Sequence, residues 1–232
     1  MSAPTIEHGT NDGHSPLASR CMLYSVFAEA FDYPDAAAIG SGILAERLDE
    51  LLNTIDPQLC RNVDWGALRD TGKESDALVV EYTRLFDVGV SGPVCSLFGG
   101  LHYGPQMKTM EEVVRYYNHF GLTLSEKMQE TPDHLTIELE FLHFLSYGEN
   151  DLSQRGEDVK SYQCAQRDFI ARHPGRWVPI MCEKLERAKP MPFFRQLCQL
   201  LDAFLQSELT RLETLHGRAS TVPVGHIPHV GD

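Results

Sequence analysis

Apolar residues recur every three or four positions along most of the chain, which places them on one face of an α-helix. The first such run begins after Ser15-Pro16 and continues through Phe31. Serine is a good N-cap, and proline suits the first helical position. Runs of the same period lie at 39–55, 78–86, 109–121, 132–145, 159–173, 177–188 and 194–217. No stretch alternates apolar and polar residues long enough to predict a strand, so the pattern predicts an all-α protein, a compact single-domain helical bundle.

Two of the predicted helices carry recognisable starts, and a long loop precedes them. Thr109-x-x-Glu112 has the pattern of a capping box, and Thr131-Pro132 repeats the cap-then-proline start. Residues 87–106 hold glycines and prolines that break a helix, and long loops inside compact domains are often functional. We predict that the helical domain spans residues 16–217, between a disordered segment at 1–15 and a disordered tail at 218–232.

The charge of the chain narrows the class of partner. The 232 residues carry a formal net charge of −13, because 33 acidic residues outnumber 20 basic ones. A charge of this sign repels phosphate, and the basic residues are scattered singly, so no nucleic acid is expected as a partner. No apolar run reaches the ~18 residues of a membrane helix, and residues 1–15 lack the pattern of an export signal. We therefore expect a cytoplasmic protein without membrane insertion.

Six cysteines are spread along the chain without a Cys-x-x-Cys pair, which argues against a zinc knuckle and against thioredoxin-like chemistry. Most of them lie among apolar residues. The sequence thus predicts reduced cysteines that fill the core. They are Cys21, Cys60, Cys95, Cys164, Cys182 and Cys198.

Nothing in the sequence points to an enzyme or to a bound cofactor, since no catalytic or phosphate-binding motif is present. One alternative is a di-metal helical bundle, because Glu140-x-x-His143 and Glu213-x-x-His216 each place a carboxylate and an imidazole on one helical face. His216 directly precedes Gly217, where a helix end frays. Solvated helix faces are therefore favoured over a metal site.

Carboxylates crowd the predicted helix that begins at Pro132. Seven acidic residues and one lysine lie between positions 126 and 151, and the helix is apolar around most of its circumference. Some of the carboxylates must then border a hydrophobic surface. Such a surface suits a peptide that has an apolar segment beside arginines.

The pair Leu85-Phe86 stands at the last turn before the glycine-rich loop. Apolar residues at helical spacing are core by default, but this position is also suited to lining a groove. We predict that Leu85, Phe86 and the Pro132 helix entry converge on one groove. The arginines of a bound peptide would meet Glu130, Asp133 or Glu138.

These motifs resemble a known family, and the resemblance covers about residues 17–215. The chain is similar to the TorD/DmsD/NarJ family of redox-enzyme maturation chaperones in Tyr82-Thr83-Arg84-Leu85-Phe86, Thr131-Pro132-Asp133-His134-Leu135 and Glu138-Leu139-Glu140-Phe141-Leu142. It resembles the branch that serves the type II DMSO reductase group in Cys95-Ser96-Leu97-Phe98-Gly99-Gly100, Met110-Glu111-Glu112-Val113-Val114-Arg115-Tyr116-Tyr117 and Phe120-Gly121-Leu122.

The resemblance implies a TorD-like all-helical fold and a role without catalysis. Such chaperones bind the precursor of a molybdenum-containing catalytic subunit, often through its twin-arginine leader, and assist insertion of the molybdenum cofactor before export. The family's leader-binding positions correspond here to Tyr82, Leu85, Phe86, Asp133 and His134. Together with Pro132 and Glu138, these are the predicted binding residues.

Two alternatives stay open, the di-metal bundle and a structural subunit that remains in the mature oxidoreductase complex. The client is undecided, as is recognition of its leader or its mature body. The oligomeric state is open as well, because helical chaperones of this type exchange segments between protomers to form homo-oligomers. His134 would tune release of the client if it titrated near neutrality.

Overall fold

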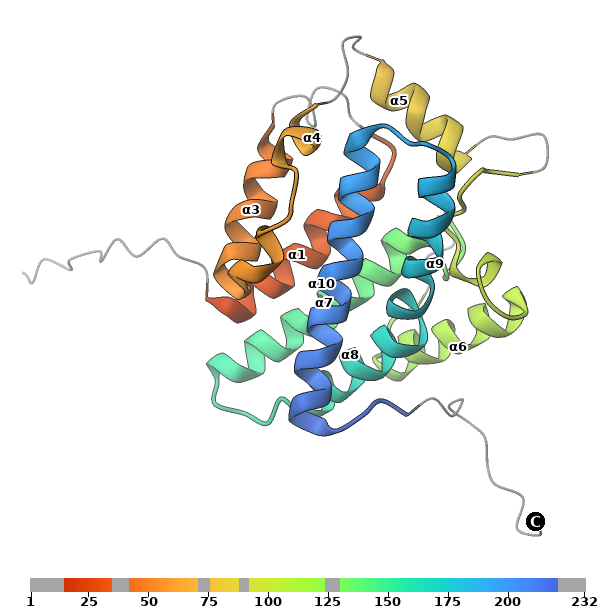
Figure 1. Ribbon diagram of the computed structural model, residues 1–232. Helices are drawn as coiled ribbons and strands as arrows, with labels where there is room; N and C mark the ends of the chain where they lie inside the picture. Colours follow the sequence, from red (N-terminus) through yellow and green to blue (C-terminus); the bar gives the residue numbers. More distant parts are fainter. Residues whose placement is uncertain (1–14, 35–41, 71–75, 88–91, 124–129, 221–232) are drawn as a thin grey trace, which may run out of the picture.

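The computed structural model is built of α-helices (Figure 1). It describes residues 15–34, 42–70, 76–87, 92–123 and 130–220. The longer helices are α1 (Pro16–Phe31), α3 (Ile43–Ile55), α6 (Gln106–His119), α7 (Leu135–Gln154), α8 (Lys160–Arg172), α9 (Pro174–Arg187) and α10 (Pro192–His216). The shorter ones are η1 (Pro57–Cys60), α4 (Trp65–Arg69), α5 (Ala77–Tyr82), the π-helical turn η2 (Thr83–Asp87) and η3 (Gly99–Leu101). The described ranges contain no strand, and the bridge with both partners in these ranges joins Phe98 and His134, so the all-α prediction is confirmed.

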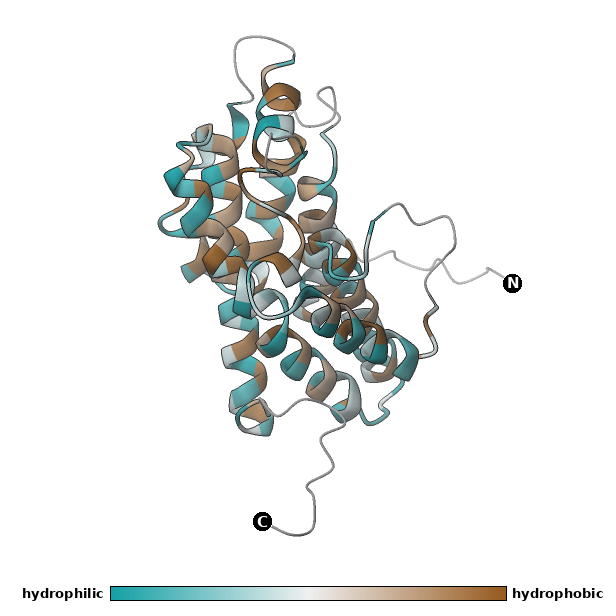
Figure 2. Ribbon diagram, turned by 90° about the vertical axis from the view of Figure 1, so that its right-hand side faces the viewer, coloured by the Kyte–Doolittle hydropathy of each residue, from teal (hydrophilic) through white to brown (hydrophobic). Residues whose placement is uncertain are grey.

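The helices form a bundle around α7, which packs against α1 and α8 (Figure 1). The last helix, α10, contacts α9, α8 and α4 and crosses in front of α7. Figure 2 shows hydrophobic and hydrophilic positions alternating around the helices, as expected when each helix buries one face. Aromatic rings fill the centre; Phe27 of α1, for example, stacks on Phe204 of α10 with 5.6 Å between the centroids.

A buried carboxylate joins the first and last helices. Glu208 of α10 is 2 % exposed and accepts hydrogen bonds from Arg20 of α1 and Arg211 of its own helix, both at 2.8 Å. Two guanidinium groups compensate the cost of burying this carboxylate. The pair of α1 and α10 is thereby fixed in register.

The helix starts agree with the sequence in one case and differ in two. The Ser15 side chain accepts a hydrogen bond from the Ala18 N–H, as predicted for the cap of α1. Helix α7 begins at Leu135 rather than at Pro132, because His134 is its N-cap and accepts from the N–H of Thr136. Helix α6 begins three residues before Thr109, so the predicted capping box lies inside a helix.

The prediction of six reduced cysteines is wrong for two of them. Cys182 and Cys198 form a disulfide between α9 and α10, with 5.8 Å between their Cα atoms. Helical periodicity cannot show this, because the pairing depends on how two helices pack. The other four are free; Cys21 and Cys95 are buried, as expected of core residues, whereas Cys60 and Cys164 are half-buried.

The residues that follow α10 contact the bundle. Helix α10 stops before Gly217, as expected, and Ala219 and Ser220 beyond it make hydrogen bonds to helical residues. Arg172 donates from Nε to the carbonyl oxygen of Ser220 at 2.9 Å, and the N–H of Ala219 donates to Glu213. The predictions of disorder at 1–14 and 221–232 lie outside the described residues. Among the helices of the described part, none combines the length and apolarity needed to span a membrane.

Candidate functional site

The π-helical turn η2 directs Leu85 and Phe86 into the core. The extra residue of a π-turn shifts the helical face, and both side chains are at most 5 % exposed. Phe86 packs edge-on against Phe194 of α10 at 5.5 Å and against Phe31 of α1 at 6.4 Å. The hydroxyl of Tyr82 donates to the carbonyl oxygen of Phe31 at 3.2 Å. These three residues therefore anchor the turn to the end of α1.

The glycine-rich stretch, residues 92–105, lies between η2 and α6 in the sequence and contacts both the η2 turn and the start of α7. Its backbone accepts and donates in sequence: Cys95 N–H donates to Leu85 O, and Leu135 N–H donates to Leu97 O, both at 2.8 Å. A side chain at Gly99 would bring its Cβ within 2.7 Å of the Trp177 indole nitrogen. Glycine is required there by the close approach of the loop to α9. The stretch thus links the Leu85-Phe86 turn to the start of α7 through two backbone hydrogen bonds.

Asp133 and Glu138 serve this interior and do not border an open groove. Both side chains are 0 % exposed. Asp133 accepts hydrogen bonds from the Gly100 N–H at 3.0 Å and from the Thr131 hydroxyl at 2.6 Å. Glu138 Oε2 accepts from Trp177 Nε1 at 2.9 Å, and burial raises the pKa of Glu138 well above its usual value. Neither carboxylate can reach the arginine of a bound peptide in this structure, because each is enclosed by the protein.

The expected open groove along Leu85, Phe86 and Asp133 is therefore not what the structure shows. Pro132 is half-buried, and its carbonyl oxygen accepts from the Tyr117 hydroxyl at 3.0 Å. It lies in the turn before α7 and not at a first helical position. The apolar surface of these residues is used for packing, since burial inside the core stabilises the fold more than exposure would.

Three exposed carboxylates lie on segments that adjoin these buried residues. We use the name acidic corner for Asp32, Tyr33, Asp87 and Glu130, all of which are exposed. Tyr33 is 59 % exposed and its ring meets Tyr82 edge-on at 5.5 Å. The corner joins the end of α1, the end of η2 and the approach to α7.

Carboxylates of the acidic corner affect the pKa values of Tyr82 and His134. Burial raises the pKa of Tyr82, and the carboxylates of Asp32, Glu130 and Asp87 raise it further. Burial lowers the pKa of His134, and the carboxylates of Glu130 and Asp32 act in the opposite direction. Two acidic groups from distant parts of the chain thus act on the same two rings. The net direction is a lowered pKa for His134, which favours its neutral form; a role of His134 in release stays a prediction.

Three members of the acidic corner, Asp32, Tyr33 and Asp87, are absent from the predicted site. For Asp32 and Tyr33 the sequence signal is only the Tyr33-Pro34 pair that ends α1, and Asp87 is only the first residue of the predicted loop. What marks them is the tertiary contact with Tyr82. Glu130, by contrast, is among the carboxylates that the sequence proposes for arginine.

The described part of the chain holds no group of three or more His, Cys, Asp or Glu side chains able to bind a metal ion. His143 uses its Nδ1 on the Cys21 carbonyl oxygen at 2.8 Å, and its partner in the motif, Glu140, is exposed. His216 Nε2 lies 2.7 Å from the Gln163 amide oxygen. The histidines of the two Glu-x-x-His pairs therefore serve contacts between helices.

Comparison with known proteins places the chain in a family. Residues 44–183 match the family model described as nitrate reductase delta subunit. The chlorate reductase assembly chaperone protein of Ideonella dechloratans is 33% identical over 165 residues, which cover 70% of this chain and 75% of that protein. The selenate reductase assembly chaperone protein of Thauera selenatis is 32% identical over 165 residues, which cover 70% of this chain and 75% of that protein. The perchlorate reductase assembly chaperone protein of Dechloromonas aromatica is 26% identical over 204 residues, 84% of this chain and 90% of that protein.

The matched region contains α3 to α8 and most of α9, so it includes the π-turn, the glycine-rich stretch and the start of α7. The relatives carry the names of chaperones and not of enzymes. The chain belongs to the nitrate reductase delta subunit family, the TorD/NarJ family that its motifs resemble.

Proposed function

We propose that this protein is a cytoplasmic, system-specific assembly chaperone for a molybdenum-containing catalytic subunit of the type II DMSO reductase group. It binds the precursor before the molybdenum cofactor is inserted, releases it for export afterwards, and catalyses no reaction itself. The observation that carries this proposal is its similarity, over most of its length, to assembly chaperones of chlorate, selenate and perchlorate reductases.

The acidic corner is the surface we propose for the arginines of the client's leader. Arginine pairs with carboxylates through two parallel hydrogen bonds, and its planar guanidinium stacks on aromatic rings. Asp32 and Glu130 supply exposed carboxylates that act on Tyr82, whose ring contacts the exposed Tyr33 ring. Of the predicted binding residues, Tyr82 and His134 form the floor of this surface. Leu85, Phe86, Pro132, Asp133 and Glu138 act by positioning the backbone beneath it.

An apolar cavity beside α7 suits the hydrophobic segment of the same leader. It has a volume of about 280 Å³ and is lined by Tyr117, Leu122, Thr123, Ile137, Glu140, Phe141 and Phe144. Ile137 lies one turn and Phe144 about three turns from His134, and a helix rises about 5.4 Å per turn. A peptide with arginines at the acidic corner would extend only a few residues to fill this cavity. Glu140 at its edge adds one more carboxylate.

The proposal is tested by the cofactor content of a client. The chain is co-expressed with candidate catalytic subunits of the chlorate, selenate and perchlorate reductase types, and each subunit is assayed for bound molybdenum. We expect at least one subunit to hold several times more molybdenum with the chaperone than without it. Equal molybdenum content for all of them would contradict the proposal.

A second candidate is a structural subunit of the mature complex, which the family description as a delta subunit favours. The two functions differ in where the protein stays. A structural subunit would co-purify stoichiometrically with the exported, cofactor-loaded enzyme. An assembly chaperone would be found with the precursor and be missing from the mature enzyme.

A further inference from the structure

The disulfide between Cys182 and Cys198 joins two helices that are already neighbours. Helices α9 and α10 run side by side in opposite directions, connected by residues 188–191 (Figure 1). Cys182 lies in the second half of α9, and Cys198 lies in the second turn of α10, 16 residues further along the chain. The bond therefore closes a small loop at the tip of this helical hairpin.

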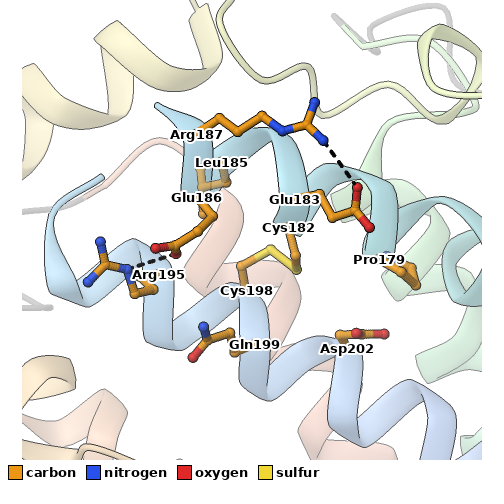
Figure 3. A pocket seen from close by; sticks show the side chains of 10 residues that line it. All are labelled: Pro179, Cys182, Glu183, Leu185, Glu186, Arg187, Arg195, Cys198, Gln199 and Asp202. Atoms are coloured by element: carbon orange, nitrogen blue, oxygen red, sulfur yellow. Dashed lines mark hydrogen bonds and ion pairs between the residues drawn. A yellow bond between two sulfur atoms is a disulfide. The ribbon is translucent and has the colours of Figure 1, made fainter. Parts of the chain in front are cut away.

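The disulfide forms part of the wall of an open cavity (Figure 3). The cavity has a volume of about 690 Å³ and is lined by Pro179, Cys182, Glu183, Leu185, Glu186, Arg187, Arg195, Cys198, Gln199 and Asp202. Its size is in the range of cavities that hold small molecules. The two cysteines differ in access, because Cys182 is half-buried whereas Cys198 is 1 % exposed.

We propose that Cys182 and Cys198 form a reversible thiol–disulfide exchange site, and that the cavity admits a low-molecular-weight thiol to Cys182. In reduction, the thiolate of the small thiol attacks Cys182 Sγ, a mixed disulfide forms there, and Cys198 leaves as a thiolate that takes up a proton. A second small thiolate then attacks the sulfur of the bound thiol, which releases a small-molecule disulfide and the Cys182 thiolate. Oxidation by the same small-molecule disulfide runs through these steps in reverse.

The fold is arranged to survive opening of this bond. Arg195 of α10 pairs with Glu186 of α9 at 2.9 Å, next to the disulfide (Figure 3). Leu185 and Leu197, from the two helices, are buried in the same core. Helices α9 and α10 thus remain in contact when both thiols are reduced, so the cysteines stay close enough to pair again.

The bond also acts on the segment beneath the acidic corner. The hairpin connection is tied to α5 and η2, because Arg84 donates to the Ala188 carbonyl oxygen and the Met191 N–H donates to Glu81. Helix α9 further holds Glu138 through Trp177. Oxidation of the pair therefore stiffens the support of η2 and of the start of α7, and reduction loosens it.

The first test counts thiols in the full-length protein. After equilibration with an excess of glutathione disulfide and unfolding without reductant, we expect at most four of the six cysteines to react with a thiol reagent, and mass spectrometry to find Cys182 linked to Cys198. After equilibration with reduced glutathione we expect all six. The oxidised form should melt about 5 to 10 °C higher. Six reactive thiols in both samples, or four that glutathione cannot raise to six, would overturn the proposal.

The second test identifies the attacked sulfur. In Cys198→Ser the accessible Cys182 has no partner, so we expect one more bound glutathione per chain than in the wild type, located on Cys182 by peptide mass spectrometry. In Cys182→Ser the buried Cys198 should remain unmodified in the folded protein. Cys164→Ser, which removes a free half-buried cysteine of α8, is the matched control and should behave as wild type. Equal modification of the two single variants would show that the cavity does not direct the exchange.

Discussion

The ring of Phe98 lies edge-on against the imidazole of His134, with 4.9 Å between their centroids. This contact joins the glycine-rich stretch to the residue that caps α7, and the two backbones pair at the same point. The acidic corner is built on this junction. Its carboxylates come from segments that only the folded chain brings together. Because these carboxylates are exposed and the residues below them are buried, substitutions can test the two groups separately.

Removing a corner carboxylate should weaken capture of a twin-arginine leader without unfolding the protein. Glu130→Gln and Asp32→Asn each delete one exposed charge that would pair with an arginine. We expect about a two- to fivefold rise in Kd for each, the range of exposed ion pairs, and a smaller effect at high salt. Fluorescence anisotropy with a labelled leader peptide measures this.

The matched control for those variants is Glu157→Gln. Glu157 is exposed and lies beyond the far end of the 20-residue α7, about 30 Å along the helix from His134. Glu157→Gln changes the net charge by the same amount as the corner variants. Because residue 157 is far from the corner, the Kd of this variant should equal that of the wild type. A comparable loss in the control would mean that net charge, and not the corner, controls affinity.

Truncating the buried side chain of Phe86 should lower the free energy of unfolding. Phe86→Ala removes a ring that contacts Phe31 and Phe194, and large-to-small changes of this kind cost about 3–5 kcal/mol. Urea unfolding followed by circular dichroism gives the free energy. Val80→Ala, at a position 65 % exposed on the adjoining α5, is the comparison and should change it by less than about 0.5 kcal/mol. An unchanged unfolding midpoint for Phe86→Ala would place this side chain outside the core.

Glu138→Gln should make the protein more stable above neutral pH. Burial raises the pKa of Glu138 above its unfolded value, which is near 4.5. The protonated side chain is therefore favoured in the folded protein. Its contribution to stability is complete below the unfolded pKa and is lost as the pH rises through the folded pKa. Glutamine still offers an oxygen to Trp177 and cannot ionise. We expect the difference in unfolding free energy between variant and wild type to grow with pH, measured by urea titration at several values. A wild type that is more stable than Glu138→Gln at high pH would show that the charged form is favoured.

His143 should give the contact between α1 and α7 a dependence on pH of its own. Its hydrogen bond to the Cys21 side chain raises the pKa of His143 to about 8. The resulting stabilisation is complete below the unfolded value of about 6.5 and disappears as the pH rises through about 8. An NMR titration of the imidazole reads the pKa directly. His143→Gln should remove this part of the pH dependence of unfolding, and an NMR value at or below 6.5 would refute the assignment.

Helical periodicity predicts most of the architecture because each long helix buries one apolar face. The start of α1 follows from Ser15-Pro16, since cap and first turn are local features. The start of α7 does not, because His134 becomes the cap only when the Phe98 segment pairs beside it. The local sequence therefore predicts a helix start at Pro132, whereas in the folded protein Pro132 lies in the turn before α7.

The candidate site shows the same division. The motif residues mark the right part of the fold, yet Asp133 and Glu138 turn out to be enclosed, since a residue type does not reveal which carboxylates find internal partners. Glu130 is exposed as a binding carboxylate must be. Asp32 and Tyr33 enter the site only through the Tyr33–Tyr82 contact, over a sequence separation that no pattern spans.

We propose above all that the exposed carboxylates of Asp32 and Glu130 receive the leader of a molybdoenzyme precursor. The most direct measurement is retention of catalytic subunits of the chlorate, selenate and perchlorate reductase types, with and without their leaders, on the immobilised protein and on its Asp32→Asn/Glu130→Gln double variant. We predict that the wild type retains at least one leader-bearing subunit, that removal of the leader weakens retention, and that the double variant, folded by circular dichroism, retains about tenfold less. Equal retention by the wild type and the double variant, or retention of none of the subunits by the wild type, would contradict the account.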